Sequence, residues 1–373
     1  MVKDTINAVY TVKNDGRDIK KLASNIAVGQ TIGIWGELPS NIRLQVSGYL
    51  AEVVSVEESA FTSTIKIAFP IQNFGNDLAA LLCSLYGKIS LAPKIRLDDI
   101  EFSQNYTQMF KGPRYGINGI REKLGIKDRP LLMSIFKPCL GLSAAELANM
   151  FSAQAEAGMD IVKDDEVLYD KDFNSVFRRL EACLKAKAKA NSRAIYAINL
   201  TGQANEILDR AVQLEKNGAD CILFNYMCYG LPFLSALRQS ISIPIMAHPA
   251  FSGAICLGTS SGVSERLILG KLPRLAGADF ILFPSQYGSI AWDKTIVLSV
   301  HKELGAPFFD IRPSWSVPSA GIKANMIKEI LVDFGEDIVI NAGTAVWEHP
   351  EGGFKGAKEF VKEVQNLPVG VSK

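Results

Sequence analysis

The stretch "PLLMSIFKPCLGLSAAELANMFSAQAEAGMDIVKDDE", residues 130–166, predicts one complete strand–helix–strand unit. It begins and ends with short apolar runs, as expected of strands buried in a parallel sheet. Between them, Ser143 and Glu146 have the spacing of a helix capping box, and Gly158 fits the end of the helix. The stretch therefore predicts a βα unit.

The alternation of predicted strands and helices continues toward the end of the chain. Six more apolar runs follow, with helical material between them. They are "AIYAINLTG" (194–202), "DCILFNYM" (220–227), "IPIMAHPAF" (243–251), "DFILFPS" (279–285), "FDIRPSWSVPSAG" (309–321) and "DIVINAGT" (337–344). Eight βα units in about 245 residues match the usual size of a TIM barrel. We therefore predict an α/β protein with a C-terminal (β/α)8 TIM-barrel catalytic domain at residues 116–373.

Residues 1–115 have a mixed pattern. The runs "NAVYTV" (7–12) and "STIKIAFP" (63–70) alternate as strands do, whereas residues 18–30 and 77–88 have helical spacing. A segment rich in glycine, proline and charge, residues 110–130, separates this region from the barrel. We predict an N-terminal α+β domain of the ferredoxin-like type.

The composition restricts the class of protein. The chain has 373 residues, is 48% hydrophobic and 21% charged, and has a net charge of +1, which argues against disorder and against a nucleic-acid-binding polycation. Its start has no signal-peptide pattern and no window resembles a membrane span, so we expect a cytoplasmic protein without a membrane partner. The six cysteines form no CxxC pair, and we expect reduced, mostly buried thiols rather than disulfides or structural zinc.

Polar or small residues follow nearly every predicted barrel strand. In a barrel these strand ends meet at one face, where active sites are built. They include Lys137, Lys163, Asp164, Asp165, Glu166, Asn199, Asn225, His248, Ser285, Ser319, Gly321, Gly343 and Thr344. By contrast, we interpret the basic run 185–193 as a solvated helix end.

The run "MDIVKDDE", residues 159–166, has two interpretations. On a strand, Lys163 and Asp165 share one side while Asp164 faces the other, and Glu166 can turn toward the first side. The cluster is then a buried ion-pair network that closes the barrel mouth, or it is a metal site. Carboxylation of neutral Lys163 by CO2 would create a carbamate, which with Asp165 and Glu166 supplies three hard oxygen donors suited to Mg²⁺.

This run resembles the metal-binding strand of the RuBisCO superfamily, in which the lysine is carbamylated. Other similar stretches are "GPRYGI" (112–117), "FKPCLGL" (136–142), "VPSAGI" (317–322) and "NAGT" (341–344). The resemblance implies an obligate homodimer with shared active sites, in which the N-terminal domain of one subunit closes over the barrel mouth of the other.

Carboxylation of a sugar phosphate is not expected. The stretch "FPSQYGSIAW" (283–292) lacks the lysine that RuBisCO has in this loop. Three further residues also differ from RuBisCO: Cys139 replaces a lysine, Pro249 a phosphate-binding arginine and Ser84 an asparagine. The chain instead resembles the RuBisCO-like enolases of methionine salvage, as in "YGKISL" (86–91) and "LGKLPRLAGADFILFPSQYGS" (269–289). This resemblance implies Mg²⁺-dependent enolisation of a phosphorylated ketone, 2,3-diketo-5-methylthiopentyl-1-phosphate.

The resemblance also implies roles for individual residues. Lys88 would be the base, Lys137 would contact the enolate oxygen or the phosphate, and His248 would contact the substrate. Further substrate contacts are expected from Lys163, Asp164, Asp165, Glu166, Ser319, Gly321, Gly343 and Thr344. Judged by the residues alone, Lys88 is better interpreted as a surface lysine after a helix-terminating glycine, whereas Lys137 could be a strand-end lysine that reaches water and His248 a core residue. Thr344, Val346 and Trp347 follow Gly343 where the enolases have a glycine triplet, which leaves the shape of the phosphate pocket open.

Two other functions remain open at this point. One is a different RuBisCO-like enolising enzyme, such as a 5-methylthioribulose-1-phosphate isomerase or a sugar-acid phosphate decarboxylase, because "KPCLGL" and "NAGTAV" depart from the enolase pattern. The other is a barrel with a binding or regulatory role only.

Overall fold

A computed structural model describes residues 4–170, 174–288 and 290–367. The chain forms two compact units. The N-terminal unit comprises Met1–Phe110, Phe251–Ile268 and Phe309–Ile311, and the barrel unit comprises Lys111–Ala250, Leu269–Phe308 and Arg312–Lys373. The division predicted between residues 115 and 116 stays a prediction, because the compact N-terminal unit is not one continuous stretch of chain.

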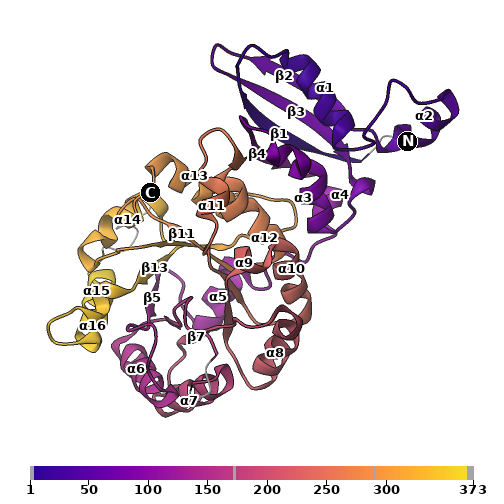
Figure 1. Cartoon of the computed structure of the whole chain (residues 1–373). Coiled ribbons are helices and arrows are strands. Elements are labelled where there is room, and N and C mark those ends of the chain that lie inside the picture. The colour runs from indigo at the N-terminus through magenta and orange to yellow at the C-terminus, as the bar shows by residue number, and fades with distance from the viewer. Residues whose placement is uncertain (1–3, 171–173, 289, 368–373) are drawn as a thin grey trace. The chain divides into compact units, whose positions relative to one another are not determined.

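The N-terminal unit is built on a five-stranded sheet with the order β10-β4-β1-β3-β2. Its strands are β1 (Thr5–Lys13), β2 (Glu52–Glu58), β3 (Thr62–Pro70), β4 (Ile95–Glu101) and β10 (Gly262–Val263). Its helical segments are α1 (Ile19–Gly29), α2 (Ser40–Val46), η1 (Ser47–Tyr49), η2 (Ile71–Asn73), α3 (Leu78–Tyr86), η3 (Lys88–Leu91), α4 (Gln104–Thr107) and α11 (Gly253–Cys256). The order βαββαβ with an antiparallel 4-1-3-2 core is ferredoxin-like, which confirms the predicted fold (Figure 1).

A distant segment completes this sheet. Strand β10 pairs in parallel with β4, and Ser264 N–H donates to the Leu97 carbonyl at 2.9 Å. Arg96 Nη2 lies 2.6 Å from Glu265 Oε2, and Arg96 Nη1 donates to the Cys256 and Gly258 carbonyls. The sequence did not predict this strand, because two residues are too few to show a period.

The barrel unit is an eight-stranded parallel sheet with the order β12-β11-β9-β8-β7-β6-β5-β13. A bridge between Ser316 and Ile338 joins its first and last strands. The strands are β5 (Leu131–Ile135), β6 (Ile161–Lys163), β7 (Ile195–Asn199), β8 (Cys221–Phe224), β9 (Ile245–Ala247), β11 (Phe280–Pro284), β12 (Trp315–Ser319) and β13 (Val339–Ala342). All eight predicted strands are present, and the predicted TIM barrel is confirmed.

Helices cover the outside of the strand ring, as Figure 1 shows for α6, α7, α8, α14 and α16. The helical segments of this unit and the π-turn η4 are α5 (Gly116–Leu124), α6 (Ala144–Ala157), α7 (Val176–Lys189), α8 (Ala204–Lys216), α9 (Tyr226–Tyr229), α10 (Leu231–Ser240), η4 (Leu267–Lys271), α12 (Leu272–Ala276), α13 (Lys294–Gly305), η5 (Ala324–Met326), α14 (Ile327–Phe334), α15 (Thr344–Trp347) and α16 (Gly353–Gln365). The predicted capping box of Ser143 and Glu146 is confirmed, as is the left-handed end at Gly158.

The interior of the barrel is filled by inward side chains of the strands, so it is a packed core rather than a pore. Helix α5 contributes Ile117, Ile120 and Leu124 to this core from the amino ends of the strands. Asp279, directly before β11, accepts hydrogen bonds from the Tyr115 and Gly116 amides at 2.6 and 3.0 Å, which fixes the start of α5. The closed base leaves the carboxyl ends of the strands as the place for a site.

The thiols are less buried than the sequence predicted. Cys183, Cys221 and Cys256 are buried, whereas Cys83 and Cys228 are exposed. The expectation was wrong for these last two because each follows an apolar run on a helix face that the fold leaves uncovered. Across the described ranges, no helix is both long and apolar enough to cross a membrane.

Candidate active site

A cavity of about 860 Å³ opens at the carboxyl ends of the barrel strands. Strands β5, β6 and β9 lead to Lys137, Lys163, Asp165, Glu166 and His248 in its lining. Strands β12 and β13 lead to Ser319, Gly321, Gly343 and Thr344. Thus every barrel residue proposed from the sequence to contact substrate, apart from Asp164, lines one cavity.

Lys163 is the most deeply placed of these side chains. It is fully buried, its Nζ donates to the Asp164 carbonyl at 2.9 Å, and it lies 3.6 Å from Glu166 Oε2. Burial lowers the pKa of Lys163, and this effect outweighs the nearby carboxylates of Glu166 and Asp165, which raise it. A buried amine of this kind favours the neutral form, which is the form that reacts with CO2.

Asp165 is paired with a lysine of the neighbouring strand. Lys137 Nζ lies 2.7 Å from Asp165 Oδ2 and 3.0 Å from Cys139 Sγ. Burial tends to raise the pKa of Asp165, but its hydrogen bond to Lys137 and further contacts hold that pKa below its usual range. Burial lowers the pKa of Lys137, yet the Asp165 contact reverses this and raises it overall. Lys137 is therefore a cation at neutral pH.

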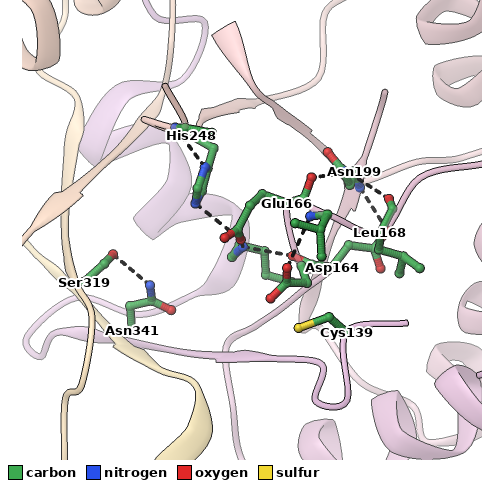
Figure 2. A network of polar contacts seen from close by, with 12 residues as sticks. Cys139, Asp164, Glu166, Leu168, Asn199, His248, Ser319 and Asn341 are labelled. Carbon is green, nitrogen blue, oxygen red and sulfur yellow. Dashed lines mark hydrogen bonds and ion pairs between the residues drawn. The ribbon is translucent and has the colours of Figure 1, made fainter. Parts of the chain in front are cut away.

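Glu166 lies between His248 and Asn199, as Figure 2 shows. Its Oε2 is 3.4 Å from His248 Nε2, while its carbonyl accepts hydrogen bonds from Asn199 Nδ2 at 3.2 Å and Asn225 Nδ2 at 3.0 Å. Burial lowers the pKa of His248 to about 4. His248 is therefore neutral at pH 7, and its ring can donate or accept a hydrogen bond.

Asp164 faces the opposite side of the strand, as the alternation predicted. Its carboxylate accepts from Tyr196 Oη at 2.7 Å and from the Asn199 amide at 3.0 Å, and Arg179 Nε lies 3.3 Å away. Both members of the Arg179–Asp164 pair are completely buried. Asp164 is directed away from the cavity, so its carboxylate is not placed to contact a substrate bound there.

The turn after β12 presents backbone to the cavity. Gly321 has φ +77°, and Ala320 has φ +74°, which is unusual for a residue with a Cβ. Ser319 Oγ donates to the Val317 carbonyl and accepts from Asn341 Nδ2, both at 2.8 Å; Figure 2 shows this pair apart from Glu166. The turn can therefore offer N–H groups to an anion.

The bulky residues after β13 do not fill the cavity. Val346 is buried, and Trp347 Nε1 donates to the Ile135 carbonyl at 2.5 Å, so neither is part of the lining. Gly343 directly precedes α15, which begins at Thr344. The replacement of the glycine triplet is therefore compatible with an open pocket.

Lys88 belongs to the N-terminal unit. It is the first residue of η3 and is exposed. A Cβ at the preceding Gly87 would overlap the Cys83 carbonyl, so glycine is required where α3 ends. Tyr86 Oη donates to the Ile95 carbonyl at 2.6 Å and accepts from the Gly262 amide at 2.9 Å, which fixes this turn.

Several residues that hold the site were not recognised as such in the sequence. Asn199 and Asn225 stood out only as polar strand ends, and their role in holding the Glu166 carbonyl was not foreseen. Tyr196 and Arg179 lie within an apolar strand and a charged helix, where no local pattern marks a buried partner of Asp164.

A divalent metal would need more than the unmodified carboxylates. Within the described part of the chain, no group of three or more His, Cys, Asp or Glu side chains could hold a metal ion. The cavity offers Asp165 and Glu166, with Lys163 beside them. The donor set fits a hard cation once Lys163 provides oxygen atoms.

Comparisons with known proteins agree with this geometry. The family model of the ribulose bisphosphate carboxylase large chain matches residues 116–367 with its catalytic domain and 2–106 with its N-terminal domain. The chain is 41% identical to the 2,3-diketo-5-methylthiopentyl-1-phosphate enolase of Geobacillus thermodenitrificans, over 95% of this chain and 91% of that protein.

Two solved structures are also similar. A rubisco-like protein (MtnW) from Alicyclobacillus acidocaldarius has a TM-score of 0.90 and 34% identity, over 97% of this chain and 94% of that one. The dimeric archaeal Rubisco from Hyperthermus butylicus has a TM-score of 0.86 and 27% identity, over 98% of this chain and 91% of that one.

Proposed function

Because the chain belongs to the RuBisCO large-chain family, we propose that it is a keto–enol tautomerase of methionine salvage. Its substrate would be 2,3-diketo-5-methylthiopentyl-1-phosphate, the compound in the name of the 41% identical relative. The reaction moves a proton from the carbon beside the phosphate ester to a carbonyl oxygen, so the enzyme is an isomerase. The product is the 2-hydroxy-3-keto-pentenyl phosphate.

One observation carries the proposal. A single cavity is lined by Lys137, Lys163, Asp165 and Glu166, and also by the turn that contains Gly321. The first group suits the stabilisation of negative charge on a substrate oxygen, and the second suits the binding of a phosphate group. A phosphorylated ketone that forms an enolate needs both.

The metal-binding residues in this proposal are Lys163 as its carbamate, Asp165 and Glu166. Mg²⁺ bound there would supply positive charge to the oxygen on which the enolate develops. The buried Lys163 amine, with its lowered pKa, supports carbamylation. Asn199 and Asn225 would keep Glu166 in position through its carbonyl.

The side chains of the protein would have separate roles in binding the substrate and removing its proton. Lys137, a cation, would attract the anionic oxygen or the phosphate, and neutral His248 would hydrogen-bond to the substrate. Lys88 would take the proton from carbon. It would reach the barrel of a second copy, so the active enzyme would be a homodimer with shared sites; the related Hyperthermus butylicus structure is described as dimeric.

The same site would lack carboxylase activity. The loop 285–293 contains no lysine, so no cation from this loop is available to hold a carboxylated intermediate. Enolisation does not need such a group, because it ends with protonation of the enolate oxygen.

A direct assay tests the proposal. Protein, Mg²⁺ and bicarbonate are incubated with the diketone phosphate, and the enol is followed by its ultraviolet absorbance. We expect an absorbance rise that requires Mg²⁺ and is absent without protein. No rise with protein that is folded by circular dichroism would reject the enolase function.

A second enolising activity is favoured by one observation. Cys139 Sγ lies 3.0 Å from Lys137 Nζ, so the surroundings of this lysine depart from the family pattern. A 5-methylthioribulose-1-phosphate isomerase or a sugar-acid phosphate decarboxylase would form a different enolate, stabilised by the same metal site. Deuterium exchange into these phosphates, without reaction of the diketone, would support this alternative.

A further inference from the structure

The described part of the loop between β11 and α13, residues 285–288 and 290–293, borders the turn proposed to bind phosphate. Pro284 and Ile290 line the cavity, and the Ser285 amide donates to the Ser319 carbonyl at 2.9 Å. The Trp292 amide donates to the Ser285 carbonyl at 3.2 Å. Both ends of the loop are therefore held close to the end of β12.

One carboxylate on α14, that of the partly buried Asp333, binds this loop. Asp333 Oδ2 accepts hydrogen bonds from Gln286 Nε2 at 2.9 Å and from Tyr287 Oη. Asp333 Oδ1 lies 2.6 Å from Lys294 Nζ, at the start of α13. The Asp333 side chain is 8% exposed and is not part of the cavity lining. Asp333 therefore binds the side chains of Gln286, Tyr287 and Lys294 but does not line the cavity.

The loop in turn packs against the turn after β12. A Cβ on Gly288 would overlap the Ala320 carbonyl oxygen and lie 3.0 Å from the Gly321 nitrogen. Gly288 thus rests directly on the Ala320–Gly321 peptide. Ala320 has φ +74°, a conformation that L residues keep only where surrounding structure imposes it.

We propose that Asp333 is a positioning residue: it anchors residues 286–288 so that Gly288 holds the Ala320–Gly321 peptide with its N–H available to the substrate phosphate. This inference rests on the proposed function for the identity of the substrate, but not for the binding of phosphate itself. Because Asp333 acts on the phosphate end, its loss affects substrate affinity and leaves proton removal unchanged.

The test compares Asp333→Ala with the wild-type protein. Titration calorimetry with inorganic phosphate, without metal, measures the affinity of the turn, and the enol assay gives KM and kcat. We expect phosphate affinity to fall by about tenfold or more, with a matching rise in KM and kcat within about twofold, as expected of an indirect displacement at the binding site. Asp337→Asn is the control, because it removes a carboxylate from the ion pair with Arg121, away from the cavity.

Further variants keep the inference testable if Asp333→Ala does not fold. Tyr287→Phe removes one hydroxyl and should raise KM by a smaller factor, whereas Gly288→Ala should raise it at least as much as Asp333→Ala. Asp333→Glu, which retains the charge, should recover part of the affinity. Unchanged phosphate affinity in folded Asp333→Ala, or in both Tyr287→Phe and Gly288→Ala, would overturn the inference. If the wild type binds phosphate but does not turn over the diketone, the proposed function fails while the phosphate titrations still decide the role of Asp333.

Discussion

Lys163 Nζ lies 3.6 Å from Glu166 Oε2, although the lysine is completely buried and the glutamate borders an open cavity. A protonated lysine at this position would be a buried cation with incomplete partners. A neutral one can react with CO2 and extend toward the carboxylates of Asp165 and Glu166. The two protonation states lead to different responses to bicarbonate.

We predict that bicarbonate increases the affinity of the wild-type protein for Mg²⁺ and that Lys163→Met abolishes this increase. Methionine fills a similar volume but cannot form a carbamate, so Mg²⁺ affinity should fall by about 100-fold or more, as for loss of a group that supports a metal site. Calorimetric titration with Mg²⁺, with and without bicarbonate, measures both effects. Lys185→Met, at a side chain that is 75% exposed, is the control. Equal Mg²⁺ affinity in wild type and Lys163→Met would rule out the carbamate.

Lys88→Ala should lose enolase turnover while Mg²⁺ binding stays intact. Removal of a general base usually costs about 10²–10⁴-fold in rate, so kcat should fall within that range. The enol assay measures kcat, and calorimetry measures Mg²⁺ binding on the same preparation. Lys20→Ala changes another exposed lysine of the N-terminal unit and should leave both unchanged. Wild-type kcat in Lys88→Ala would show that the base lies elsewhere.

Arg179→Met should destabilise the barrel. The variant leaves Asp164 buried without its cation, and loss of one partner of a buried ion pair costs about 3–5 kcal/mol in the free energy of unfolding. Chemical denaturation followed by circular dichroism measures the loss. Arg178→Met, on the same helix, provides the comparison. A free energy of unfolding equal to that of the wild type would mean that Tyr196 and Asn199 alone satisfy Asp164.

His301 should make stability depend on pH. Its Nδ1 lies 2.8 Å from Ser316 Oγ, its ring packs on Phe334, and burial lowers its pKa despite the opposing charge of Asp337. Because the folded-state pKa lies below the unfolded value of about 6.5, its contribution is fully present above that pH and is lost as the pH falls toward the folded-state pKa.

Denaturation curves between neutral and mildly acidic pH test this. The free energy of unfolding of the wild type should fall more steeply with decreasing pH than that of His301→Gln. His248 contributes with the same sign in both proteins, so the difference between the curves reports His301. Parallel curves would contradict the prediction.

Much of the fold could be predicted because the barrel repeats one simple pattern. Each strand is an apolar run ended by a polar residue, and these runs located Lys137, Lys163, His248 and Ser319 at one face. The alternation of side chains along β6 was enough to separate Asp164 from Lys163 and Asp165. The basic run at 185–193 ends helix α7 as expected, but Lys187 is not solvated: its Nζ lies 2.7 Å from Asp220 Oδ2.

The residues that support the site could not be predicted, because their contacts are long-range and produce no local sequence pattern. Arg179 occupies an ordinary position in a charged helix, and only the packing of α7 on β6 and β7 brings it to Asp164. Asp333 meets Gln286 at a distance of 47 residues along the chain. Such pairs are selected by the tertiary fold, and no spacing rule along the sequence reveals them.

The fifth strand of the N-terminal sheet, β10, is synthesised long after the other four, so the sheet cannot be completed early during translation. Strand β4 ends at Glu101, but its partner β10 begins only at Gly262. At usual translation rates the ribosome needs about 8–30 s to add the intervening residues, so the nascent N-terminal unit exposes one open sheet edge for that time. The carboxylate of Glu265, which pairs with Arg96, is also missing until then. Folding of the first 110 residues is thus completed by chain synthesised after most of the barrel strands, and chaperones have a defined interval in which to act on that edge.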